Sequence, residues 1–229
     1  MTGPARIAVA LDTSDARQLE QWAELFAGEA DVLKIGLEAT VALGPRAITT
    51  AAAHAPVFCD LKLHDIPNTV AGAAAAAARA GASMITAHAA GGPAMIEAAV
   101  RAAPDVAILA VTVLTSLDDA TLADLGMSAA ATAVPALAKR AEAAGASGIV
   151  CAGDQIAGVR EVVGSAMSVV VPGIRPATAA TQDQARVVTP EQAVRAGADL
   201  LVVGRPVTAA ADPLAALHDL RRQAAGLHT

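Results

Sequence analysis

The chain has 229 residues, a net charge of −6 and a hydrophobic fraction of 55%. Nucleic-acid binding needs a basic face or stacking rings, and the three aromatic residues (Trp22, Phe26 and Phe58) are too few, so the composition excludes a nucleic-acid partner. No apolar run reaches the roughly 18 residues of a transmembrane helix, and the N-terminus lacks a signal-peptide pattern. We therefore expect a cytoplasmic protein with no membrane partner. Two distant cysteines, Cys59 and Cys151, are expected as buried thiols and not as a disulfide.

Short apolar segments alternate with longer amphipathic or alanine-rich segments along the whole chain. The short segments are almost entirely apolar, which is typical of parallel strands covered on both faces. Glycine follows three of the long segments, at Gly81, Gly145 and Gly197, and is predicted to end a helix in each case. The predicted strands are 6–12, 32–37, 57–62, 84–89, 106–113, 148–151, 168–174 and 200–205, and helices are predicted at 15–27, 39–53, 68–80, 93–102, 133–144 and 190–196.

This alternation predicts an α/β protein that forms a single (β/α)8 TIM barrel. An open, doubly wound sheet is the alternative. The regular spacing shows no switch in strand order, which favours the barrel. Because no long linker or change of composition divides the chain, we expect one catalytic domain spanning residues 1–229.

Polar residues gather where the predicted strands end, which is where a barrel places its active site. Asp60 and Lys62 alternate on one strand and should share a face, while Lys34 lies on the preceding strand about 5 Å away. These residues predict an alternating row of lysine, aspartate and lysine, which Asp65 can extend. A buried salt bridge is the alternative, but such bridges are often no more stabilising than apolar packing.

Lysine is rare in this chain, which makes its placement informative. Of the 16 basic residues only Lys34, Lys62 and Lys139 are lysines. A lysine can lose and regain its proton when its surroundings shift its pKa, whereas arginine effectively cannot. Lysines inside apolar strands therefore indicate proton chemistry.

The segment after the last strand predicts a phosphate site. Gly204 and Arg205 stand there, and together with the loop after the seventh strand they occupy the usual phosphate position of barrel enzymes. A surface arginine is the alternative. His64 and His88 raise the possibility of a metal site, but their spacing matches no ligand motif, so we expect no metal.

The run Asp60-Leu61-Lys62-Leu63-His64-Asp65-Ile66-Pro67-Asn68-Thr69 resembles the signature of the orotidine 5′-monophosphate (OMP) decarboxylase family. Its short Asp-x-Lys-x-x-Asp core is shared with sugar-phosphate enzymes such as 3-keto-L-gulonate 6-phosphate decarboxylase and hexulose-6-phosphate synthase. The Ile-Pro-Asn-Thr continuation points to the nucleotide enzyme. Further matching segments follow in order along the chain: Leu11-Asp12, Lys34-Ile35-Gly36, His88-Ala89-Ala90-Gly91-Gly92, Leu114-Thr115-Ser116, Pro172-Gly173-Ile174-Arg175, Asp183-Gln184-Ala185-Arg186 and Gly204-Arg205-Pro206-Val207-Thr208.

The resemblance implies a cofactor-free enzyme of pyrimidine biosynthesis that converts OMP to UMP. It implies a homodimer with shared active sites, in which Asp65, Ile66 and Thr69 reach the neighbouring subunit's site. Alternatives are a Mg²⁺-dependent sugar-phosphate decarboxylase or synthase and a non-catalytic nucleotide-binding barrel. The implied roles are Asp12 and Lys34 at the ribose, Lys62 as proton donor, Asp60 and Asp65 beside the leaving carboxylate, Thr115 and Pro172 at the pyrimidine, and Arg175, Gln184 (which Gln182 could replace), Gly204 and Arg205 around the phosphate.

Overall fold

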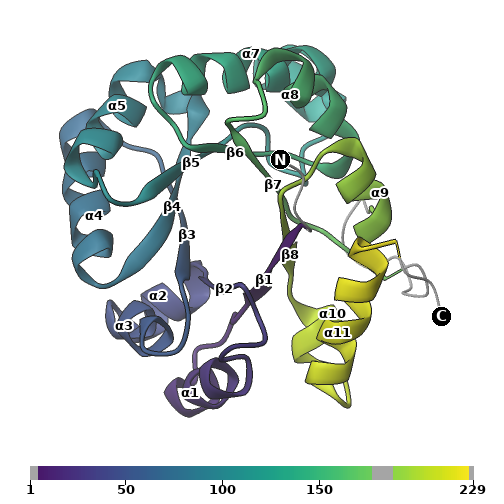
Figure 1. Ribbon diagram of the computed structural model, residues 1–229. Coiled ribbons are helices and arrows are strands. Elements are labelled where there is room, and N and C mark those ends of the chain that lie inside the picture. Colours follow the sequence, from purple (N-terminus) through teal and green to yellow (C-terminus); the bar gives the residue numbers. More distant parts are fainter. Residues whose placement is uncertain (1–4, 177–187, 227–229) are drawn as a thin grey trace.

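Eight parallel strands close into a barrel with helices around its outside (Figure 1). The computed structural model describes residues 5–176 and 188–226. The strands run in sequence order, and the first pairs with the last, with Arg6 opposite Leu200, which closes the ring. The predicted TIM barrel is therefore confirmed. The strands are β1 (Arg6–Ala10), β2 (Val32–Ile35), β3 (Val57–Leu63), β4 (Ala82–His88), β5 (Ala107–Val111), β6 (Gly148–Val150), β7 (Ser168–Val171) and β8 (Leu200–Val203).

The helices follow the strands in alternation, as expected for this fold. Within the described ranges, five of them contain ten or more residues, and short helical turns fill several of the loops. The longer helices are α1 (Ala16–Leu25), α4 (Pro67–Arg79), α5 (Pro93–Ala102), α7 (Ala130–Ala143) and α11 (Pro213–Ala224), and the shorter ones are α2 (Leu37–Leu43), α3 (Arg46–Ala52), α6 (Asp119–Asp124), α8 (Ile156–Val162), α9 (Pro190–Ala196), α10 (Arg205–Thr208), η1 (Ala89–Gly91) and η2 (Gly153–Gln155). No helix in the described part of the chain is long and apolar enough to cross a membrane.

The prediction of one helix over 39–53 is wrong, because two helices occupy this region. The first, α2, ends at Gly44, whose φ of 65° is a conformation that glycine adopts without a steric penalty. Pro45 follows and caps α3. Proline has no backbone N–H to continue a helix, so the pair ends one helix and starts the next. The predicted glycine caps are confirmed, since Gly81, Gly145 and Gly197 all have positive φ.

Each strand presents one set of side chains to the barrel interior and the other to the helices, as period-two alternation requires. Inside the barrel a separate buried cluster fills the lower part of the lumen. Its members are Ala8, Val32, Phe58, Met84, Leu109, Val170, Leu200 and Val202. Two residues further along β2, β3 and β4, the inward positions hold Lys34, Asp60 and Thr86 instead. The apolar cluster thus forms the floor beneath a polar layer.

Both thiols are buried and free, as expected. Burial raises the pKa of Cys59 and of Cys151 to about 12 in each case, so neither forms the reactive thiolate at neutral pH. We therefore expect almost no reaction with Ellman's reagent at pH 8 in the native protein and two reacting thiols per chain in guanidinium chloride. Rapid labelling of the native protein would contradict this burial.

Candidate active site

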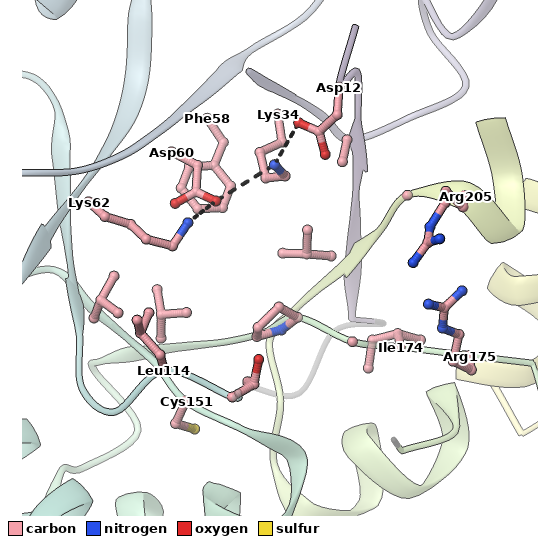
Figure 2. Close-up of a pocket in the computed structure, with 18 of the residues that line it drawn as sticks. Asp12, Lys34, Phe58, Asp60, Lys62, Leu114, Cys151, Ile174, Arg175 and Arg205 are labelled. Carbon is pink, nitrogen blue, oxygen red and sulfur yellow. Dashed lines mark hydrogen bonds and ion pairs between the residues drawn. The ribbon is translucent and has the colours of Figure 1, made fainter. Parts of the chain in front are cut away.

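A cavity of about 370 Å³ lies at the C-terminal ends of the strands (Figure 2). This is the end of a barrel that carries active sites. Charged groups and apolar side chains share its wall, which suits a ligand that is partly apolar and partly anionic. Of the residues singled out from the sequence, nine line it: Asp12, Lys34, Asp60, Lys62, Thr115, Pro172, Arg175, Gly204 and Arg205.

Four charged side chains form a continuous row across β1, β2 and β3. The Nζ of Lys62 lies 2.9 Å from Oδ2 of Asp60, and the Nζ of Lys34 lies 3.6 Å from the same oxygen. Lys34 also lies 3.4 Å from Oδ1 of Asp12. Figure 2 shows the row turned into the cavity. The predicted lysine–aspartate–lysine arrangement is therefore present, and Asp12 extends it at the β1 end.

The two lysines keep the Asp60 carboxyl ionised. Burial alone would raise the pKa of Asp60, but the positive charges of Lys34 and Lys62 and hydrogen bonds from Lys62 and Thr86 outweigh it. The pKa of Asp60 consequently lies below its ordinary value. Because Asp60 then carries its negative charge at neutral pH, it can hold both ammonium groups in fixed positions.

The end of β3 departs from the regular pleat that the alternation argument assumed. Between the pairs Cys59–Ile85 and Leu63–Ala87 the register shifts, so that three residues of β3 face one residue of β4. Lys62 has a φ of 51°, and no other residue except glycine has positive φ in the described ranges. Asp60 and Lys62 do meet, as predicted, but through a bulge that turns the backbone.

Two arginines lie across the cavity from Lys62. Figure 2 shows Arg175, after β7, and Arg205, after β8, with their guanidinium groups close together on the side away from Lys62. The backbone N–H of Arg175 donates to the carbonyl of Val188, which ties the loop after β7 to the start of the next segment. Paired guanidinium groups favour a phosphate or another doubly charged anion. The cavity therefore has one end for an anion and another for proton chemistry.

Apolar side chains also line the cavity, and those on the strands were not found from the sequence. They come from the inward positions of β5, β6 and β8 and from the loops after β5 and β7: Val111, Val113, Leu114, Val150, Ile174 and Val202. The alternation of side chains along a strand could have identified the strand residues, because each lies two positions from another residue that faces the barrel interior. Such a surface suits one face of a flat ring.

Three predicted site residues lie outside the cavity of their own chain. Asp65 and Ile66 are exposed at the turn between β3 and α4, and Thr69 is exposed in the first turn of α4. Asp65 accepts a hydrogen bond from the backbone N–H of Ile66 at 2.6 Å and does not join the charged row within one chain. A further predicted residue, Gln184, and the alternative Gln182 lie outside the described residues.

The rings of His64 and His88 lie close together, with centroids 5.2 Å apart and planes tilted by 33°. Burial lowers the pKa of His88, and the neighbouring His64 and the positive charge of Lys62 lower it further. His88 is therefore neutral at physiological pH. In the described part of the chain, the one group of three His, Cys, Asp or Glu side chains close enough to share a metal ion is Glu20, Glu24 and His54, on α1 and after α3.

The closed barrel and the charged cavity at its C-terminal mouth define a TIM-barrel enzyme. Residues 5–220 match the model of the "Orotidine 5′-phosphate decarboxylase / HUMPS family", and the chain belongs to that family. A curated orotidine 5′-phosphate decarboxylase of Anaeromyxobacter sp. (strain K) is 55% identical over 225 residues, which cover 97% of this chain and 98% of that protein. The enzyme of the same name from Thermobifida fusca is 51% identical over 93% of this chain and 92% of its own length.

A solved structure shows the same relationship in three dimensions. The crystal structure of orotidine 5′-phosphate decarboxylase from Lactobacillus acidophilus superposes with a TM-score of 0.85 at 34% identity, covering 96% of this chain and 99% of that chain. The similarity therefore extends over the whole barrel, and the predicted family is confirmed.

Proposed function

We propose that this protein decarboxylates OMP to UMP in pyrimidine biosynthesis, without a metal or cofactor. The observation that carries the proposal is the placement of Lys62, held 2.9 Å from Asp60, at the end of the cavity opposite Arg175 and Arg205. A nucleotide with its phosphate at the arginines would direct its base toward Lys62. The names of the curated relatives support the same reaction. Two buried, free thiols suit the reducing cytoplasm, where we expect the enzyme to work.

The chemical step needs a cation and a proton at one place. When the bond between C6 of the pyrimidine and its carboxylate breaks, carbon dioxide leaves and the electron pair stays on C6, in the ring plane, where the ring π-system stabilises it poorly. The ammonium group of Lys62 would stabilise this charge electrostatically. Nζ then gives its proton to C6, which yields UMP, and regains a proton from water. Asp60 would hold the ammonium group in place throughout.

The other lining residues would bind the remaining parts of the substrate. Asp12 and Lys34 lie at the end of the row nearest the barrel's first strand and would contact the ribose hydroxyls. Thr115 and Pro172 also line the cavity and would contact the pyrimidine. Gly204 permits close approach to the phosphate beside Arg205, and Gln184 would join them there.

We further propose a homodimer with two shared active sites. Ile66 is 66% exposed beside Asp65, and Leu37 and Val41 on α2, which follows the neighbouring strand, are 52% and 83% exposed. Large apolar side chains that are exposed in a single chain favour burial against a partner. In such a dimer Asp65 of the partner subunit would complete the charged network next to the leaving carboxylate, while Ile66 and Thr69 would close the edge of the pocket.

The direct test follows the ultraviolet absorbance of OMP with purified protein in excess EDTA. Steady conversion to UMP is expected and would eliminate the metal-dependent alternative as well. Activity on a sugar phosphate alone, only with added Mg²⁺, would overturn the proposal in favour of the sugar-phosphate branch of the family. UMP binding without conversion would indicate a nucleotide-binding barrel.

Replacing Arg205 by alanine tests the phosphate end. A charge-assisted contact contributes roughly 1.5–3 kcal/mol, so the KM for OMP should rise about 10- to 100-fold. Turnover of orotidine, which has no phosphate, should be unaffected by the same change. Arg101→Ala is the matched control, since Arg101 is an exposed arginine on α5. A KM for OMP within twofold of the wild-type value would place the phosphate elsewhere.

A further inference from the structure

Thr86 on β4 connects the two most important charged residues of the cavity and was not found from the sequence. Its side chain is completely buried. Its hydroxyl donates to Oδ1 of Asp60 at 2.9 Å and accepts the backbone N–H of Lys62, also at 2.9 Å. Thr86 does not line the cavity, so it has no direct contact with a ligand there.

These contacts compensate for the bulge in β3. Where the register between β3 and β4 shifts, the backbone N–H of Lys62 is bonded to the Thr86 hydroxyl. Leaving this buried N–H without an acceptor would be unfavourable, because it would have lost its hydrogen bond to water without gaining another. Lys62 also has a left-handed backbone, with φ at 51°, which is sterically unfavourable for a residue with a Cβ atom. A strained conformation of this kind persists only where its surroundings fix it.

The Thr86 hydroxyl also fixes the orientation of the Asp60 carboxylate, because the two oxygens of the carboxylate have different partners. Oδ1 accepts from Thr86, and Oδ2 faces both ammonium groups, at 2.9 Å from Lys62 and 3.6 Å from Lys34. The carboxylate therefore cannot rotate without losing the threonine bond. One side chain on β4 thus fixes both the main chain of Lys62 and the anion that orients its ammonium group.

We infer that Thr86 is a positioning residue for the proposed decarboxylation: its hydroxyl sets the direction in which Lys62 presents its proton. The inference rests on the proposed function. A hydroxyl that acts only on the placement of Lys62 affects the chemical step, because a shift of about 1 Å in a reacting group can lower the rate on the order of 100-fold. It leaves substrate binding nearly unchanged, since the arginine end of the cavity is remote from it.

The test uses variants that differ by a single hydroxyl. Thr86→Val keeps the shape and removes the hydroxyl, and we expect kcat to fall about 100-fold with a KM for OMP within about threefold of wild type. Thr86→Ser keeps the hydroxyl and should retain kcat within about fivefold. Thr112→Val is the matched control, because Thr112 is the other buried threonine of the described barrel. Its hydroxyl donates only to the Val150 carbonyl, so kcat should not change.

Several results would overturn the inference. A Thr86→Val enzyme with kcat within threefold of wild type would do so, as would an unchanged kcat with a raised KM. If Thr86→Val does not fold, the pair Thr86→Ser and Thr86→Ala still differs by one hydroxyl, and equal kcat values in that pair would reject the role. If wild type itself fails to convert OMP, the proposed function falls and the inference falls with it, whereas an active wild type with an active valine variant rejects the inference alone.

Discussion

Replacing Lys62 by alanine should lower turnover of OMP by at least about 10⁴-fold while UMP still binds. In the proposed mechanism the change removes both a proton donor and the cation that stabilises the developing charge, and each effect alone is commonly as large as about 10²- to 10³-fold. Lys34, the other lysine of the row, cannot substitute, because its Nζ lies between Asp12 and Asp60 and its side chain is 9% exposed. The measurement pairs OMP kinetics with calorimetric binding of UMP.

Two variants control this experiment. Lys139→Ala removes the exposed lysine of α7 and should leave turnover at the wild-type level. Lys62→Arg keeps the positive charge but replaces a proton donor by a group that does not give up its proton, so it should remain nearly inactive. If Lys62→Ala retained even a tenth of wild-type turnover, the proton would have to come from another group.

Mixing two inactive variants should restore activity if the sites are shared between subunits. Asp65→Ala and Lys62→Ala homodimers would each have two defective sites. A hybrid dimer would have one site with both defects and one with neither. Random reassortment gives half hybrids, so the mixture should recover about a quarter of wild-type activity per subunit. The two chains are unfolded and refolded together, and hybrids are identified by a tag on one of them.

The result distinguishes a shared site from a self-contained one. Hybrids that form and stay inactive would mean that Asp65 serves its own chain, and they would reject the composite site. Asp65 lies on the exposed turn before α4 and makes no bond to Lys62 within its chain. Glu38→Ala together with Lys62→Ala is the matched control mixture; Glu38 is an exposed acidic residue of α2, and its variant should be active alone.

The order and number of strands could be predicted from the sequence because buried parallel strands are nearly continuous apolar runs. Charged residues interrupt these runs at the strand ends, which is why Lys34, Asp60 and Lys62 could be placed together. The turn at Gly44 and Pro45 was missed, since the apolar pattern of 39–53 continues across it. Helical periodicity records which side chains are buried, whereas the break depends on backbone conformation.

Two features of the site could not be predicted for different physical reasons. The register shift at the end of β3 depends on how β3 pairs with β4. The sequence of one strand alone does not determine which residues of the neighbouring strand it pairs with. Thr86 did leave a signal, as a hydroxyl within an otherwise apolar strand, but threonine is also an ordinary strand residue. Only the contacts with Asp60 and Lys62 distinguish its role.

Under the proposed mechanism, the left-handed backbone of Lys62 makes one residue both unfavourable for stability and necessary for activity. Glycine adopts this conformation without the steric cost of roughly 1–2 kcal/mol that a lysine incurs. Selection for stability alone would therefore favour glycine at residue 62. A laboratory screen for heat resistance would therefore enrich inactive barrels unless growth without added uracil were imposed alongside it.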